Sequence, residues 1–119
     1  MNLSEWEQAG QYFASTEGRL FYRVAGEGEP LLLLHGFPES WYSWRHQFSP
    51  LAAAGYHVVA PDMRGYGKSD KPAEITAYNQ VEVVNDIIGL IPALGYETAI
   101  VIGHDWGANV GWLTLATDP

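Results

Sequence analysis

Short apolar segments recur along the chain and are separated by turn residues. The pattern predicts five strands, at residues 12–15, 20–24, 31–34, 56–60 and 99–102. The last three are nearly continuous apolar runs, which is typical of strands buried on both faces of a sheet. In the second strand apolar residues alternate with polar or small ones, so one of its faces is expected to be exposed.

Three longer segments are predicted to be helices, at residues 41–54, 78–94 and 108–116. In the second of these, apolar residues recur at helical spacing. Pro50 is expected to break the first helix, and Pro92 to kink the last turn of the second, because proline lacks an amide donor. Gly55 and Gly95 follow the two segments and are expected to end them.

Buried strands that alternate with helices indicate an α/β fold, with a mostly parallel sheet flanked by helices on both faces. In such sheets, ligands bind beyond the carboxyl ends of the strands. Two of the loops that leave those ends carry unusual residues, and these loops are the candidates for chemistry.

Composition narrows the class of protein. The chain has 119 residues, of which 47% are hydrophobic and 17% charged, so a packed core is expected. Six Lys and Arg against 14 Asp and Glu give a net charge of −8, which argues against nucleic acid and anionic membranes as partners. The chain has no Cys, which excludes disulfides, Cys-ligated zinc and thiol catalysis. No metal or cofactor site is predicted.

The sequence was also searched for membrane spans and signal peptides. No apolar run approaches the ~18 residues of a membrane span. The first residues are acidic and lack the basic and then apolar order of a signal peptide. These observations predict a soluble, cytoplasmic protein.

The strongest chemical motif is Gly103-His104-Asp105-Trp106-Gly107, placed directly between a predicted strand and a predicted helix. This is the pattern of a nucleophile elbow, a sharp turn with the nucleophile at its centre. Both glycines are expected because side chains at their positions would collide with the neighbouring strand and helix. The alternative is that Asp105 is only the N-cap of the following helix, a role that does not require two glycines.

Aspartate at the centre of the elbow has a chemical consequence. A carboxylate, with a usual pKa of ~3.9, is ionised at neutral pH without help from a base. Its attack on an acyl carbon would give an anhydride, whereas attack on a saturated carbon gives an alkyl ester that water can cleave. Asp105 therefore favours the opening of an epoxide or the displacement of a halide by covalent catalysis.

A second motif, His35-Gly36-Phe37-Pro38, follows the strand at residues 31–34. Gly36 allows close approach of the backbone, and Pro38 fixes the turn, with a cis bond as one option. The backbone amide of Phe37, together with that of Trp106, is a candidate oxyanion hole for ester hydrolysis. The alternative is a purely structural turn between strand and helix.

The glycine-rich residues 62–70 form a third motif, Asp-Met-Arg-Gly-Tyr-Gly-Lys-Ser-Asp. Its spacing fits neither a P-loop nor a dinucleotide fingerprint. We predict a structural loop in which Asp62 and Arg64 are hydrogen-bonding anchors.

Together the segments HGFPESWYSWR (residues 35–45), APDMRGYGKSDKP (60–72) and GHDWG (103–107) resemble the α/β-hydrolase superfamily, and more closely its soluble epoxide hydrolases. The resemblance implies a small-molecule epoxide or related electrophile as substrate, Asp105 as nucleophile, and the Phe37 and Trp106 amides as oxyanion donors. It also implies the sheet order 1-2-4-3-5, which places the strands at 31–34 and 99–102 side by side.

Dehalogenases of the same superfamily are the alternative. Haloalkane dehalogenases share the Asp elbow but usually carry Asn where this chain has Phe37. Fluoroacetate dehalogenases share His-Gly-Phe-Pro but typically carry Arg where this chain has Trp106. The combination of Phe37 and Trp106 favours an epoxide hydrolase.

The resemblance further implies groups that have no counterpart in the chain. These are a helical cap with two Tyr that bind the epoxide oxygen, and a late His, oriented by an acidic residue, that activates water. Residues 106–119 contain no His, and neither His104 nor His35 is expected to replace it. We therefore expect residues 1–119 to be the N-terminal part of an α/β-hydrolase core domain, without cap and C-terminal strands, and inactive as they stand.

An incomplete core has a structural consequence. The strand at 99–102 would present an open apolar edge, which favours self-association. A non-catalytic half-domain that folds only with a partner is the corresponding alternative for the function.

Overall fold

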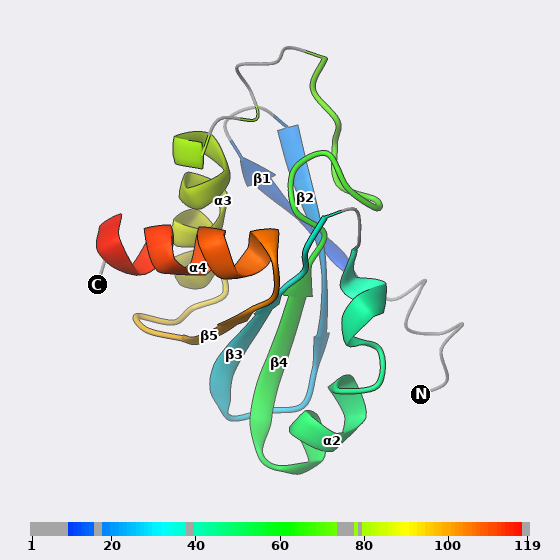
Figure 1. The fold of residues 1–119 in the computed structure, drawn as a ribbon. Coiled ribbons are helices and arrows are strands. Elements are labelled where there is room, and N and C mark those ends of the chain that lie inside the picture. Colours follow the sequence, from blue (N-terminus) through cyan, green and yellow to red (C-terminus); the bar gives the residue numbers. More distant parts are fainter. Residues whose placement is uncertain (1–9, 16–17, 38–39, 74–77, 79, 118–119) are drawn as a thin grey trace.

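The computed structural model describes residues 10–15, 18–37, 40–73, 78 and 80–117. One five-stranded sheet forms the centre of the molecule (Figure 1). Its strands are β1 (Gln11–Ser15), β2 (Gly18–Ala25), β3 (Glu29–Leu34), β4 (Tyr56–Pro61) and β5 (Ile100–Gly103). All five predicted strands are therefore present, with each bound within two residues of its predicted place.

The strands follow the order β1-β2-β4-β3-β5, which confirms the order implied by the resemblance. The sheet is mixed. Strands β4, β3 and β5 run parallel to one another, while β2 is antiparallel to both β1 and β4. The parallel part carries the two loops of interest, because β3 and β5 are neighbours and end at the same edge.

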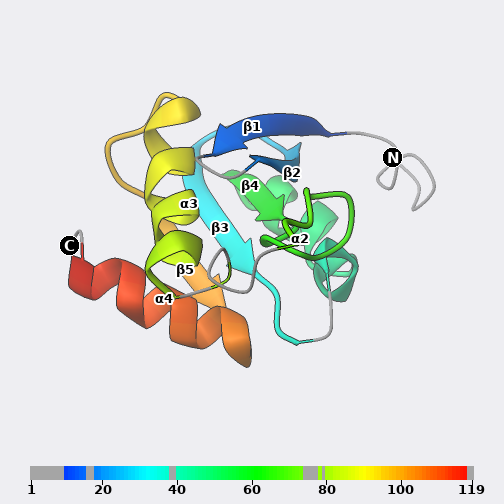
Figure 2. The same cartoon turned by 90° about the horizontal axis from the view of Figure 1, so that it is seen from above.

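Helices cover both faces of the sheet (Figure 2). Helices α3 (Gln80–Ala93) and α4 (Trp106–Thr117) pack on one face. The short 3-10 helix η1 (Trp41–Trp44) and α2 (Phe48–Ala53) pack on the other. None of the helices in the described part of the chain is both long and apolar enough to cross a membrane.

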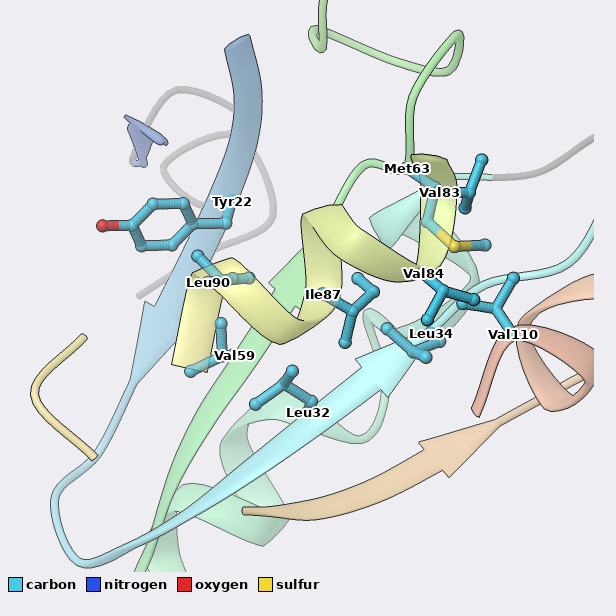
Figure 3. Packing of buried hydrophobic residues seen from close by; sticks show 10 residues of the cluster. All are labelled: Tyr22, Leu32, Leu34, Val59, Met63, Val83, Val84, Ile87, Leu90 and Val110. Carbon is cyan, nitrogen blue, oxygen red and sulfur yellow. The ribbon is translucent and has the colours of Figure 1, made fainter. Parts of the chain in front are cut away.

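The larger core lies between the sheet and α3, and Figure 3 shows its side chains. Leu32 and Leu34 of β3 point into it, against Ile87 and Leu90 of α3. Leu31 and Leu33 point to the opposite face and join a smaller core with Trp41 and Phe48. Because successive side chains of a strand alternate between faces, β3 needs apolar residues at every position, as its sequence has.

The prediction of an exposed face on β2 is wrong. Leu20, Phe21, Tyr22 and Arg23 are all buried. The Arg23 guanidinium lies over the Trp41 ring, 4.3 Å from the ring centroid, and pairs with the Asp62 carboxylate at 3.3 Å. A polar residue in the alternating pattern therefore marks a buried ion pair in this strand.

The prediction that β5 is buried on both faces is also wrong. Val101 packs against the larger core, whereas Ile100 and Ile102 are each 39% exposed. Ile100 and Ile102 lie beside Leu31 and Leu33 in the parallel register. On that face η1 packs over β3 and β4, and α2 packs over β4 and β2, so the two isoleucines have little cover.

The segment predicted as one helix at 41–54 forms two, and the break falls before Phe48 rather than at Pro50. Pro50 occupies the first turn of α2, where a backbone amide has no partner inside the helix and proline costs little. Gly55 and Gly95 follow their helices with φ of 99° and 90°, so both predicted helix ends are confirmed.

Candidate active site

The parallel pairing of β3 and β5 brings the two candidate loops together. Leu34 is the register partner of Gly103, each being the last residue of its strand. The next amide, that of His104, still donates to the Leu34 carbonyl at 3.1 Å. The loop after Leu34 and the elbow after Gly103 therefore start side by side.

The elbow has the strained backbone that its sequence predicts. Asp105 has φ of 56° and is the one residue other than glycine with positive φ in the part of the chain that the structure describes. A Cβ on Gly103 would collide with the carbonyl of Gly107, and a Cβ on Gly107 with the carbonyls of Leu34 and His35. Both glycines are thus required by the close approach of strand, turn and helix.

The geometry of Asp105 does not fit the alternative of a simple helix cap. An N-cap residue has an extended backbone, and its side chain accepts from the second or third amide of the helix. The backbone of Asp105 is in the left-handed region instead, with φ of 56°. Its Oδ2 accepts a hydrogen bond from the amide of Phe37, 68 residues earlier, at 3.1 Å. Its carboxylate is directed across to the other loop.

Two backbone amides stabilise the ionised carboxylate. The hydrogen bond from the Trp106 amide, followed by that from Phe37, holds the pKa of Asp105 below its usual range, and the charge of His104 contributes. These are the two amides that were predicted from the sequence to be oxyanion donors. The structure brings them together on one carboxylate.

His35 locks the second loop from inside and is fully buried. Its Nε2 accepts a hydrogen bond from the Met63 amide at 2.9 Å, so the proton of the neutral ring resides on Nδ1. Nδ1 in turn lies 3.0 Å from the Gly36 carbonyl oxygen. Both ring nitrogens are therefore engaged, and His35 cannot act as a general base in this arrangement.

Three further residues of the two motifs, Gly36, His104 and Pro38, differ in how they relate to the site. Gly36 faces the elbow so closely that a Cβ on it would lie 2.6 Å from the Asp105 Cβ. His104 is exposed and takes part through its backbone amide and its charge. Pro38 lies outside the described residues.

The loop at residues 62–70 is anchored as predicted. Asp62 accepts from the Trp41 amide at 2.9 Å and from the Lys68 amide at 3.1 Å, besides its pairing with Arg23. Arg64 forms a two-bond ion pair with Asp86 of α3, at 3.0 and 2.7 Å, and both side chains are at least 97% buried. These ties fix the loop against β2 and α3 at the edge where the site lies.

An open recess of about 500 Å³ lies over the carboxylate. It is lined by Phe37, Tyr66, Asp105, Trp106 and Asn109. Sequence reasoning missed Tyr66 and Asn109. Tyr66 belongs to the loop assigned only a structural role, and Asn109 lies one turn into α4. The signal available for Tyr66 was its place between two glycines, and for Asn109 the helical spacing of four residues from Asp105.

Comparison with known proteins agrees with this geometry. The family model described as the alpha/beta hydrolase fold matches residues 29–119. The chain therefore belongs to the α/β-hydrolase fold family.

Its relatives in that family include epoxide hydrolases. Epoxide hydrolase 3 of Siraitia grosvenorii is 52% identical over 87 residues, which are 73% of this chain and 28% of that protein. Epoxide hydrolase B of Mycobacterium tuberculosis is 57% identical over 86 residues, 72% of this chain and 24% of that protein. The crystal structure of an epoxide hydrolase from Vigna radiata superposes with a TM-score of 0.88 at 42% identity, covering 91% of this chain and 35% of that one. The chain thus spans about a quarter to a third of the length of these proteins.

We expect Gly107→Ala to destabilise the chain by about 1–3 kcal/mol or more, because the added methyl has no space beside β3. The matched control is Gly111→Ala in the same helix, where a Cβ would lie 3.5 Å from Val101, an ordinary contact. That substitution should instead raise the free energy of unfolding, by about 0.5–1 kcal/mol. Urea unfolding of both variants measures the difference, and equal effects would show that the elbow is not tightly packed.

Proposed function

We propose that this chain carries the nucleophile of an epoxide hydrolase, with Asp105 attacking a ring carbon of the epoxide. The observation that carries the proposal is the Asp105 carboxylate, presented at a strained elbow beneath an open recess, with the Phe37 amide donating to it at 3.1 Å and the Trp106 amide also stabilising it. The named function of the relatives supports the substrate class.

The first step follows from the state of the carboxylate. Because the two amides lower the pKa of Asp105, its carboxyl group is ionised at neutral pH and can act as a nucleophile. A carboxylate oxygen forms a bond to the epoxide carbon while the carbon–oxygen bond of the ring breaks, and the electron pair passes to the ring oxygen. The product is an alkyl ester on Asp105 and an alcohol once a proton arrives.

The second step is hydrolysis of that ester to a diol. Attack of water on the ester carbonyl puts negative charge on the carbonyl oxygen, which the Phe37 and Trp106 amides are placed to stabilise. The lining of the recess includes neither a His nor a second carboxylate. Hydrolysis in the parent enzyme would accordingly use a base from elsewhere, and on the present chain we expect the ester to accumulate.

Incubation with 1,2-epoxybutane should add the mass of one epoxide to the chain, and peptide mapping should place it on Asp105. Asp105→Asn should abolish the adduct, whereas Asp70→Asn, which alters an exposed carboxylate paired with Arg19, should leave it unchanged. The rate should be constant from neutral pH downward until the acid range below the usual carboxyl pKa, where protonation removes the nucleophile.

Other outcomes of the same experiment distinguish the alternatives. Halide release from 1-bromobutane without any epoxide adduct would favour a dehalogenase. Absence of both products would overturn reactivity of this chain and leave a half-domain that needs further elements to act.

We further propose that two copies of the chain associate through β5. The described residues contain no strand on its outer edge, and Ile100 and Ile102, on one face of β5, are each 39% exposed. A groove of about 780 Å³ runs along the same edge between α3 and α4, with Trp112 and Leu115 on its wall. An unpaired apolar edge of this kind is a template for a further strand.

Sedimentation velocity should therefore show a concentration-dependent dimer. Ile102→Lys should shift the chain to monomer, since a charge on an edge strand opposes pairing. Val81→Lys, on the exposed surface of α3, should not. A monomer at all concentrations would contradict association through β5.

A further inference from the structure

Asn109 lines the recess over Asp105 with a side-chain amide that the proposed chemistry does not use. The residue is exposed and ends the first turn of α4. No hydrogen bond joins its side chain to any residue in the described part of the chain. Asparagine is also a poorer helix former than alanine or leucine. Neither packing nor helix formation therefore accounts for an asparagine at this position.

The helix fixes where this amide lies relative to the nucleophile. The backbone amides of Ala108 and Asn109 donate to the Asp105 carbonyl at 3.1 and 3.3 Å, so the helical hydrogen bonds of α4 begin at the elbow itself. Residues four apart lie on the same face of a helix, and the Cα–Cβ bonds of a helix tilt toward its N-terminus. The Asn109 side chain is thus carried toward Asp105, while the fully buried Val110 holds this turn against the core.

The lining of the recess comes from two sides. Phe37 and Tyr66 belong to the loops after β3 and β4, and their rings meet edge to face with centroids 6.4 Å apart. Trp106 and Asn109 belong to α4. The Tyr66 hydroxyl and the Trp106 indole N–H are polar points on aromatic rings, whereas the Asn109 amide offers a donor N–H and an acceptor C=O on neighbouring atoms. A ligand hydroxyl, which both donates and accepts, is the smallest group that matches this pair.

We propose that Asn109 makes the site selective for epoxides that carry a hydroxyl group on the carbon next to the ring. This inference rests on the proposed function and names the substrate class within it. The hydroxyl has to lie close to the ring because Asn109 is a single helical turn from the nucleophile. The Asn109 amide then binds this hydroxyl while Asp105 attacks a ring carbon, and the rings of Phe37 and Tyr66 cover the hydrocarbon part of the substrate.

Glycidol and 1,2-epoxybutane test this role, because they have nearly the same shape and differ by a hydroxyl in place of a methyl group. The rate of adduct formation is measured with each, and the ratio of the two rates is compared between variants, so that their different intrinsic reactivity cancels. Asn109→Leu should lower the ratio of the glycidol rate to the 1,2-epoxybutane rate by about three- to tenfold, the effect of losing a hydrogen bond at an open site. Leucine is the better helix former, so α4 should stay intact.

The matched control is Asn85→Leu, the same substitution at an exposed position of α3 outside the recess. It should keep the wild-type ratio of the two rates. If Asn109→Leu also keeps that ratio, the proposal is overturned, and a hydroxyl preference of the wild type would belong to another group of the lining.

A binding measurement separates failure of this inference from failure of the proposed function. In the Asp105→Asn chain, where no ester can form, each epoxide is titrated while the NMR signals of the Asn109 side-chain NH₂ group are followed. The added Asn109→Leu substitution identifies these signals by their loss. Glycidol should shift them, and 1,2-epoxybutane at the same concentration should shift them much less.

An equal response to the two epoxides, or no response to either, would overturn the role of Asn109 whether or not the wild type forms an adduct. A selective response to glycidol, in a chain whose wild type forms no adduct, would support recognition of the hydroxyl and count against Asp105 as a nucleophile in this chain.

Discussion

The parallel pairing of β3 with β5 is the interaction on which the candidate site depends. It places Leu34 opposite Gly103, so the two strands end together and release their loops at one edge of the sheet. The loops then approach within contact distance because Gly36, Gly103 and Gly107 have no side chains to obstruct them. A carboxylate on one loop can meet an amide of the other only under these conditions.

This close approach also explains the electrostatics of the site. An exposed carboxylate is normally solvated by water, but Asp105 receives hydrogen bonds from the amides of Trp106 and Phe37. Those donors favour its charged form and orient it, at the expense of a left-handed backbone at Asp105. In the proposed reaction, the same two donors would remain available for the carbonyl oxygen of an ester on Asp105.

The loop at residues 62–70 connects the packing of the domain to the site. Asp62 and Arg64 tie it to β2, η1 and α3 through buried ion pairs and amide contacts, and His35 ties it to the loop after β3. Tyr66 extends from this anchored loop into the recess. The loop therefore supports the site mechanically and also supplies part of its lining.

Much of this arrangement could be predicted from the sequence, and the exceptions share a cause. Apolar runs located the strands, and the glycines around Asp105 located the elbow, because these signals are local. The sheet order came from the resemblance to a family. The burial of Arg23 depends on Asp62, 39 residues away, and the exposure of Ile100 and Ile102 depends on which helices cover β5. Tyr66 was missed for the same reason, since its place beside Asp105 exists only after the sheet has formed.

The most direct test of the central claim, that two loops hold one ionised carboxylate, is an NMR titration of the Asp105 carboxyl carbon together with the amide protons of Phe37 and Trp106. We predict a titration midpoint below the usual ~3.9 of aspartate, with both amide signals shifting at that same midpoint. An ordinary midpoint, with amides that do not respond, would contradict it.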